Sequence, residues 1–236
     1  MLPRMVDTPV IVTPRPVPRE PEMISDGGGL PFTPAAVVAE FAALDPHEPS
    51  AQALIEQIDR GRRQANKRGL FRRGAPLAPL DDSEKLAGWR ALAISADEVL
   101  YAKGRPPQLL TVAVKSDRKD RWTVVGVSNS RPLRVTRDGV RASSWRLDPE
   151  FEVSPTDTEL HVLVTELTMA SGTRAADRIL QPDLHLDQDE LLLRLYVKPL
   201  EGYTGRSRLY ETPVVVKLPE PVGSREIVDG ALYQAD

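Results

Sequence analysis

Apolar residues follow three different spacings along this chain, and each spacing predicts a different kind of structure. They are interspersed with prolines in residues 10–21, recur every three or four residues in residues 33–75, and recur every two residues from about residue 89 onward. A spacing near 3.6 is typical of a helix with one buried face, whereas a spacing of two is typical of a half-buried strand. The pattern predicts an α+β protein that is mainly β, with a short helical hairpin before the sheet.

Residues 33–75 predict two helices. Thr33 and Pro34 give the first helix a capping hydroxyl and a proline at its first position, and Ser50 is a candidate cap for the second, which is expected to end near Gly69. The positions expected to face the core are Val37, Val38, Phe41 and Leu44 in the first helix, and Leu54, Ile55 and Ile58 in the second. The two helices together form the predicted hairpin.

Seven short runs with turn residues between them predict strands. They cover residues 109–115, 121–128, 133–136, 140–146, 159–168, 191–198 and 209–217. Asp138-Gly139 between two of them is the strongest hairpin signal in the chain. Strands at this spacing indicate an antiparallel β-sandwich or a strongly curved sheet. Residues 82–102 fit a helix and a strand equally well.

The chain is therefore divided into three predicted parts. Residues 1–32 form an extended, proline-rich arm with a glycine hinge, residues 33–75 form the helical hairpin, and residues 76–236 form an antiparallel β domain. Proline fixes φ and removes a backbone donor, so the arm is expected to be polyproline-like. Gly27–Gly29 is expected to be a hinge of low stiffness.

The arm is the strongest candidate for binding a partner. It has little with which to build a core of its own, and it contains a short β-prone segment suited to adding a strand to an open sheet edge. The residues predicted to bind another subunit in this way are Val10, Ile11, Val12, Pro14, Pro16 and Pro18. The alternative is an arm that folds back on its own domain.

The carboxyl-terminal half resembles a known family through three segments. These are the run Glu159–Leu167, the segment Val197–Gly202 and the block Val216–Gly230, whose prolines, glycines, Arg225 and Asp229 have a distinctive spacing. Over residues 132–230 the chain is similar to a β-rich module of uncharacterised actinobacterial exported proteins and lipoproteins. The resemblance implies a β-rich fold and no defined activity.

Two departures from that family concern cysteine. Family members often carry one cysteine after the central strand and a second after the Pro-Leu-Glu-Gly segment, where this chain has Met169–Gly172 and Gly202–Gly205. The missing pair implies adaptation to a reducing compartment. More distantly, two helices before a curved sheet in residues 35–147 are similar to the NTF2-like plan, an analogy of fold alone.

Composition and charge narrow the function classes. The chain has 236 residues, a net charge of −3 and no cysteine, which excludes disulfides, thiolate zinc sites and cysteine nucleophiles. No apolar run approaches the roughly 18 residues of a membrane span. The first residues, Met1–Arg4, do not resemble the start of an export signal. We therefore expect a cytoplasmic or particle-associated protein.

Candidate catalytic and metal-binding residues give weak signals. His47, His161 and His185 share no metal-ligand spacing, and each is expected to be a surface or packing residue. An acidic cluster is expected to form a solvated turn, with a calcium site as the alternative although its spacing is not that of an EF-hand. The cluster consists of Asp183, Asp187, Asp189 and Glu190.

Nucleophile and phosphate motifs are absent from the sequence. The segment Gly126–Ser130 fails the Gly-x-Ser-x-Gly pattern at its last position, and no P-loop is found. A basic run could contact an anion or an acidic partner, although a solvated helix end explains it as well. It contains Arg60, Arg62, Arg63, Lys67, Arg68, Arg72 and Arg73. Nucleic acid is not the expected partner of an acidic chain.

Together these observations favour a non-enzymatic structural or interaction component of a larger bacterial or phage-like assembly. Its expected partners are protein subunits, of the same or a different chain, and no cofactor is expected. The first alternative is a ligand- or polymer-binding β-sandwich module that uses a groove of the curved sheet. The second is an enzyme whose site is assembled from scattered residues without a local motif.

Overall fold

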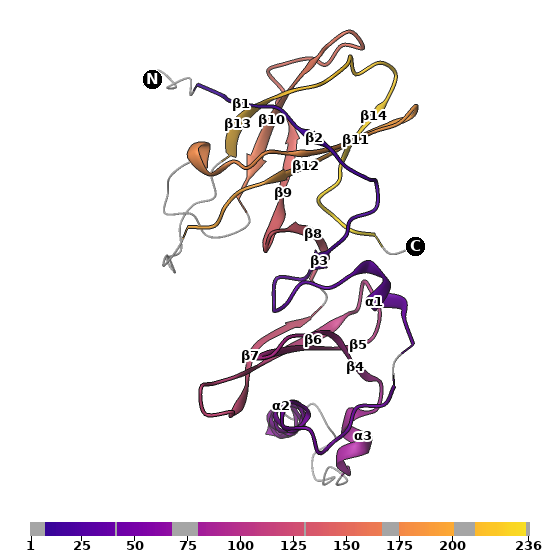
Figure 1. The fold of residues 1–236 in the computed structure, drawn as a ribbon, viewed down its shortest axis with the longest axis vertical. Coiled ribbons are helices and arrows are strands. Elements are labelled where there is room, and N and C mark those ends of the chain that lie inside the picture. The colour runs from indigo at the N-terminus through magenta and orange to yellow at the C-terminus, as the bar shows by residue number, and fades with distance from the viewer. Residues whose placement is uncertain are drawn as a thin grey trace. The chain divides into compact units, whose positions relative to one another are not determined.

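The computed structural model of the chain describes residues 8–40, 42–67, 80–129, 131–166, 175–200 and 211–234 (Figure 1). The chain forms two compact units. Unit 1 combines the chain up to Glu22 with Arg134–Gln234, and unit 2 contains Met23–Leu133. Within these units the fold is α+β and mainly β, which confirms the predicted fold class.

The division into units differs from the three parts predicted from the sequence. Unit 2 unites the predicted helical residues with the first four long strands, while the arm joins the later strands as part of unit 1. The reason is burial: the apolar face of the second helix has to cover a sheet, and the nearest sheet in the sequence is the one that follows it.

Unit 2 is a helix packed on a four-stranded antiparallel sheet. The strands are β4 (Trp89–Ile94), β5 (Glu98–Lys103), β6 (Leu110–Ser116) and β7 (Trp122–Asn129), and they pair in that order. The helix α2 (Pro49–Lys67) contacts β6 and β7. Its buried Leu54 and Ile55 pack with Val112 and Val114 of β6 in one apolar cluster.

The helices of unit 2 do not form the predicted hairpin. Helix α1 (Pro34–Val38) is capped by Thr33 as expected, but it ends after five residues and lies beside β4. Ser50 lies inside α2, where its hydroxyl shares a hydrogen bond of 2.8 Å with the Tyr101 hydroxyl. Phe41 lies outside the described residues.

Residues 82–102, for which the sequence pattern fits both a helix and a strand, contain one helix and two strands. Helix α3 (Asp82–Leu86) begins with a capping box, in which Asp81 accepts from the Glu84 backbone and the Glu84 side chain accepts from the Asp81 backbone. Strands β4 and β5 follow within residues 89–103. A single helix five residues long, followed by a short hairpin, gives no sustained period for a sequence pattern to detect.

The three glycines at residues 27–29 are held against the sheet of unit 2. A Cβ at Gly29 would lie 2.8 Å from the Cβ of Ala113, and a Cβ at Gly126 would lie 2.5 Å from the backbone oxygen of Gly28. The short strand β3 (Ile24–Ser25) precedes this loop. Backbone hydrogen bonds between Ile24 and Phe32 close the loop. The glycines therefore allow close backbone approach, in contrast to the predicted flexible hinge.

Unit 1 is a curled sheet around an apolar core. Its strands from the carboxyl-terminal half are β8 (Arg134–Arg137), β9 (Val140–Leu147), β10 (Glu159–Thr165), β11 (Asp183–Leu186), β12 (Glu190–Tyr196), β13 (Glu211–Lys217) and β14 (Glu226–Asp229). A single 3-10 turn, η1 (Ala176–Arg178), precedes β11. Leu160, Val162 and Val164 alternate inward along β10 and are at most 1% exposed.

The arm supplies two further strands of unit 1, β1 (Val10–Val12) and β2 (Arg15–Pro16). The strand order is β1-β13-β10-β9-β12-β11-β2, with β14 also paired to β12 and β8 to β9. Three pairs in this sheet are parallel: β1 with β13, β2 with β11, and β12 with β14. The sheet is therefore mixed, because strands from opposite ends of the chain enter it without the constraint of a hairpin.

Candidate functional site

The first strand of the arm lies on a sheet edge of its own chain. In β1, Val10 pairs with Val214 and Val12 with Val216 of β13. The side chains of Val10 and Val12 pack against the core of unit 1, whereas Ile11 is 62% exposed. The structure thus shows the arm folded back on its own unit, the alternative that the sequence left open.

The second strand of the arm explains the spacing of its prolines. The backbone nitrogen of Arg15 donates to the Pro182 oxygen at 2.9 Å, and that of Val17 donates to the Leu184 oxygen at 2.9 Å. Pro14, Pro16 and Pro18 alternate with these donors. A strand with prolines at every second position carries its amide hydrogens on one edge only, so β2 can pair with β11 and presents no donors on its outer side.

β1 and β2 occupy the two ends of the strand order and are separated in the chain by Thr13 and Pro14 alone. The arm therefore passes directly from one edge of the curled sheet, β13, to the other, β11 (Figure 1). A side-chain bond supports the crossing, because the Gln181 amide donates to the Thr13 oxygen at 3.3 Å. One segment therefore pairs with both β13 and β11, which would otherwise be open to strand addition.

A buried carboxylate anchors the arm. Asp183 at the start of β11 is 4% exposed, and it accepts from Arg15 Nε at 2.6 Å, from Arg137 Nη1 at 2.5 Å and from the Tyr196 hydroxyl at 2.8 Å. The Arg137 guanidinium also lies 4.4 Å above the Tyr196 ring centroid. One carboxylate thus ties the arm to strands β8, β11 and β12.

The electrostatics of this network follow from burial and hydrogen bonding. Burial raises the pKa of the Tyr196 phenol well above its ordinary value, and the charge of Asp183 raises it further. The hydrogen bond to Asp183 raises the pKa of the Arg15 guanidinium. Both shifts favour the protonated forms of Tyr196 and Arg15, which are the forms that donate to the buried carboxylate.

A buried arginine holds the next part of the arm. Arg194 in β12 is 4% exposed, and its guanidinium donates to the backbone oxygens of Pro18, Arg19 and Gly230. Burial lowers the pKa of Arg194. At the surface, Arg19 forms an ion pair with Glu190 at 3.3 Å. These bonds continue the attachment of the arm beyond β2, up to the end of its proline-rich part.

The predicted acidic cluster is divided between these contacts. Asp183 and Glu190 bind arginines of the arm, and Asp187 accepts from the backbone nitrogens of Asp189 at 2.9 Å and Glu190 at 2.8 Å. The expected solvated turn is limited to the residues between β11 and β12. Among the described residues, no group of three or more histidine, cysteine or acidic side chains is arranged to hold a metal ion.

The three histidines lie in different surroundings. His161 in β10 stacks on Phe151, with ring centroids 3.8 Å apart and planes 9° apart. His185 Nδ1 lies 3.2 Å from the Val17 oxygen, so it contacts the arm. His47 is exposed, and its backbone nitrogen donates to Asp45. None of the described histidines is paired with another.

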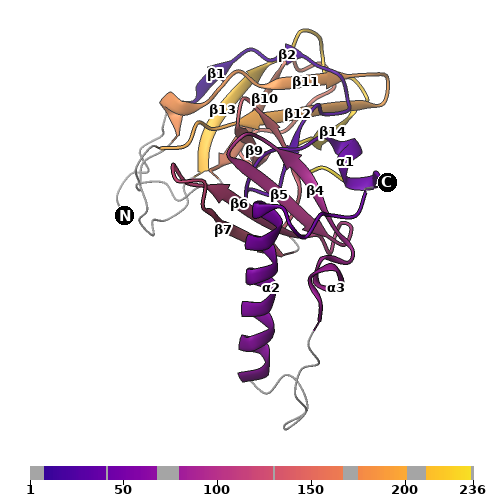
Figure 2. The same cartoon turned by 60° about the horizontal axis from the view of Figure 1, so that its bottom comes forward.

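The basic run is described only in part. Arg60, Arg62 and Arg63 lie on the carboxyl-terminal turns of α2, beyond Ile58, the last of the apolar residues that pack on the sheet. Figure 2 shows these turns extending past the strands of unit 2. Arg68, Arg72 and Arg73 lie outside the described residues, so the run as a candidate anion site stays a prediction.

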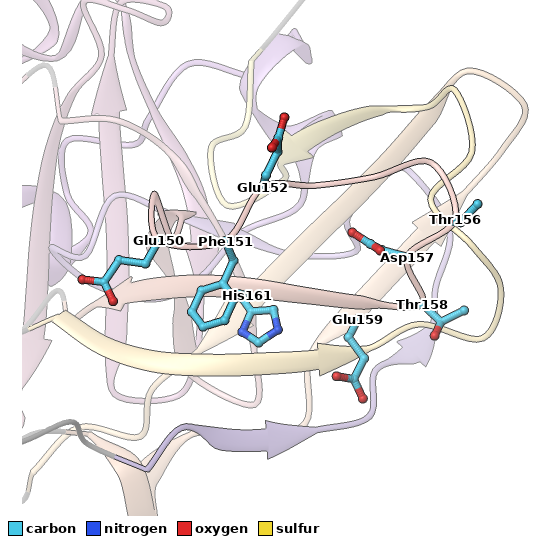
Figure 3. A pocket seen from close by; sticks show the side chains of 8 residues that line it. All are labelled: Glu150, Phe151, Glu152, Thr156, Asp157, Thr158, Glu159 and His161. Carbon is cyan, nitrogen blue, oxygen red and sulfur yellow. The ribbon is translucent and has the colours of Figure 1, made fainter.

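The structure also contains an open cleft of about 530 Å³ in unit 1, beside β10. Four carboxylates line it, and Figure 3 shows them on different sides of the stacked rings of Phe151 and His161. They belong to Glu150, Glu152, Asp157 and Glu159. The loop that carries most of them is fixed by Asp157, which accepts from the Ser154 nitrogen at 2.7 Å. Such a cleft attracts cations and repels anions.

Several residues of the arm site were not found from the sequence. Arg15, Arg137, Arg194 and Tyr196 carry no motif, because their partners lie far away in the chain. The alternation of proline with non-proline residues at positions 14–18 is the one signal that could have indicated a one-sided edge strand. It distinguishes this strand from a free polyproline segment.

Comparison with known proteins gives no match: no family model fits the chain, and none was found among curated proteins or solved structures. The resemblance of residues 132–230 to the exported β-rich module stays a prediction. The positions where that family carries cysteine, residues 169–172 and 202–205, lie outside the described residues. No described helix is both long enough and apolar enough to cross a membrane.

Proposed function

We propose that the protein is a non-enzymatic structural component of a larger assembly, whose copies are joined by exchange of the amino-terminal arm. One observation carries this proposal. A single segment of about a dozen residues forms both ends of the unit 1 strand order, yet it is joined to the rest of unit 1 only through unit 2. A strand of this kind can be supplied by the same chain or by a second copy.

The energetics of exchange support the proposal. The contacts of Val10, Val12, Arg15 and Arg19 are all made with residues of unit 1, so an identical arm from another copy would form the same set. Arm exchange therefore replaces each contact within one chain by the same contact between two chains. The protein concentration then sets the ratio of single copies with a bound arm to copies joined by exchanged arms. The segment Glu20–Glu22 connects the arm to unit 2, and it would act as the hinge when the arm moves to another copy.

The absence of cysteine allows a direct test. Val10 and Val214 are paired in the β1–β13 register, so the double variant Val10→Cys/Val214→Cys should form a disulfide within one chain. The two single variants are then unfolded, mixed, refolded together and oxidised. Arm exchange predicts a disulfide-linked dimer containing one chain of each kind, detected on a non-reducing gel.

A matched control measures random cross-linking. Ile94 in unit 2 is 73% exposed and is remote in sequence from the arm, so Ile94→Cys is mixed with Val214→Cys in the same way. The proposal requires the mixture that contains Val10→Cys to give a clearly higher yield of disulfide-linked dimer than this control. If the double variant closes within one chain while the mixture yields no dimer above the control, the arm is not exchanged.

A second candidate function, the ligand-binding module, is favoured by the open cleft beside β10. A volume of about 530 Å³ lies within the usual range for small-molecule sites. The half-exposed Phe151 gives a stacking surface, and the surrounding carboxylates select cationic ligands. Calorimetric titration with spermine tests this candidate. Spermine binding that is lost in the double variant Phe151→Ala/Glu152→Gln and kept in the unit 2 variant Glu56→Gln supports this candidate. Absence of spermine binding to the parent protein refutes it.

A further inference from the structure

Strand β7 is an unpaired edge of the unit 2 sheet. It follows β6 at the end of the strand order, and no described strand pairs with its outer side. Its eight residues, Trp122–Asn129, include no charged residue and no proline. Two of its side chains are large, apolar and exposed: Val125 at 58% and Val127 at 48%. An uncharged edge with exposed valines is the kind of strand that pairs with another chain.

Two other end strands of these sheets, β2 and β4, have features that limit such pairing. In unit 1, β2 has prolines at alternate positions on its outer side. In unit 2, the opposite edge strand β4 carries the charged Arg90, whose guanidinium donates to the Val37 oxygen of α1 at 3.1 Å, and α1 lies beside this strand. Natural sheets use prolines, covering segments and bulges to prevent edge-to-edge contact; β7 contains no proline and has one bulge, at Val125.

The register of β7 leaves its central residues available. Ala113 pairs with Gly126 and Val114 with Val124, so Val125 is an extra residue that is not matched in the β6 ladder. Such a bulge leaves the inserted residue unpaired in the ladder and increases the local twist of the strand, and the Val125 side chain is 58% exposed. Gly126 lies between the two exposed valines, and its missing side chain makes room for the Gly28 backbone of the same chain.

We propose that β7 pairs antiparallel with β7 of a second copy of this chain, around a twofold axis at Gly126. In this register Val125 of each copy lies opposite Val127 of the other, and the pairing covers Val124–Ser128. The match is self-complementary, because the two exposed valines form two identical cross-strand pairs. A register shifted to Val125 would place Val127 opposite the exposed Thr123 and would lose both pairs.

This contact is independent of the arm, since it uses unit 2 alone. It goes beyond arm exchange by giving each copy a second surface. The two contacts together would let copies of the chain join in a continuous series, with β7 pairs alternating with exchanged arms. Either contact can fail without the other, because arm exchange is tested at Val10 and Val214 and β7 pairing at Val125 and Val127.

The test uses a background in which the arm cannot exchange. In oxidised Val10→Cys/Val214→Cys protein, sedimentation should show a concentration-dependent dimer. Val125→Glu alone and Val127→Lys alone place a charge opposite a valine and should weaken the dimer at least about tenfold. Both side chains are exposed, so the melting temperatures of the variants should not change.

The register is tested by combining the two changes. In Val125→Glu/Val127→Lys protein every glutamate would face a lysine of the second copy, so dimerisation should return to near the parent level. Mixing the two single variants should likewise give a heterodimer that neither forms alone. A monomeric parent protein, single variants that dimerise normally, or a double variant that stays monomeric while the parent dimerises would each overturn the proposal.

Discussion

Arg15 and Asp183 are 168 residues apart in the chain, and their side chains meet with Nε and Oδ1 2.6 Å apart. The arginine belongs to the arm and the aspartate to β11, so this contact joins the two parts of unit 1 that the chain separates. The Asp183 side chain is almost fully buried, whereas the Arg15 side chain is 47% exposed. The stabilisation therefore depends more on the buried acceptor than on the exposed donor.

Asp183→Ala should destabilise unit 1 strongly. The change removes the shared acceptor of three donors and leaves the guanidinium of Arg137 and the buried hydroxyl of Tyr196 without that partner. The free energy of unfolding should fall by about 3–5 kcal/mol. Urea denaturation followed by tryptophan fluorescence measures the change.

Asp138→Asn is the control for this prediction. Asp138 lies 3.9 Å from the same Arg137, but its side chain is 92% exposed, and asparagine accepts its positive φ of 51°. We expect a change below about 0.5 kcal/mol. Equal effects of the two variants would contradict a special role for the buried carboxylate.

Val17→Pro should weaken the attachment of β2. It removes the backbone donor to the Leu184 oxygen. The expected cost is about 1–3 kcal/mol, because the carbonyl of Leu184 loses its partner. Val17→Ala keeps the donor and should cost less. Hydrogen exchange at Arg15 is the local readout; unchanged protection in the proline variant would argue against the one-sided strand.

Gly126→Ala should destabilise unit 2. A Cβ at this position would lie 2.5 Å from the backbone oxygen of Gly28, and backbone atoms cannot move aside at low cost. We expect a loss of about 1–3 kcal/mol in thermal or urea unfolding. Gly61→Ala on α2 meets nothing within 4 Å and should stabilise the helix by up to about 1 kcal/mol. A neutral Gly126→Ala would show that the glycine loop does not pack closely on β7.

Tyr196 should make the protein sensitive to alkaline conditions. Its pKa is raised in the folded state, so the stabilisation is complete below the unfolded-state pKa of about 10 and is lost as pH rises toward the folded value. Between pH 10 and 11.5 the fall in the free energy of unfolding from this group should steepen toward its limit of about 1.4 kcal/mol per pH unit. The slope should be smaller in Tyr196→Phe protein, and equal slopes would contradict the prediction.

The sequence predicted local elements where a short segment contains its own signal. The hairpin at Asp138-Gly139 is confirmed, with φ of 51° and 75° at the two residues and Arg137 paired with Val140. The alternation along β10 and the core face of α2 are confirmed for the same reason. Each depends on a period or a turn residue that acts over a few positions.

The sequence did not predict contacts that depend on distant parts of the chain. The pairing of β1 with β13 and of β2 with β11 joins residues about 170–200 positions apart, and no local period encodes such partners. Strands β11 and β14, four residues each, were missed because their length is too short for a pattern. The acidic residues at 183–190 were interpreted as a turn because their arginine partners lie in the arm and in β8.

The order of unit 1 along the chain has a consequence for how the protein is made. The ribosome releases β1 first and its neighbour β13 about two hundred residues later. Unit 2 is complete well before that moment and can fold while synthesis continues. Unit 1 cannot, because its first strand has to wait for nearly the last one. A nascent chain that stalls before residue 211 would carry a finished helix-on-sheet unit and an arm whose first strand has no β13 to pair with.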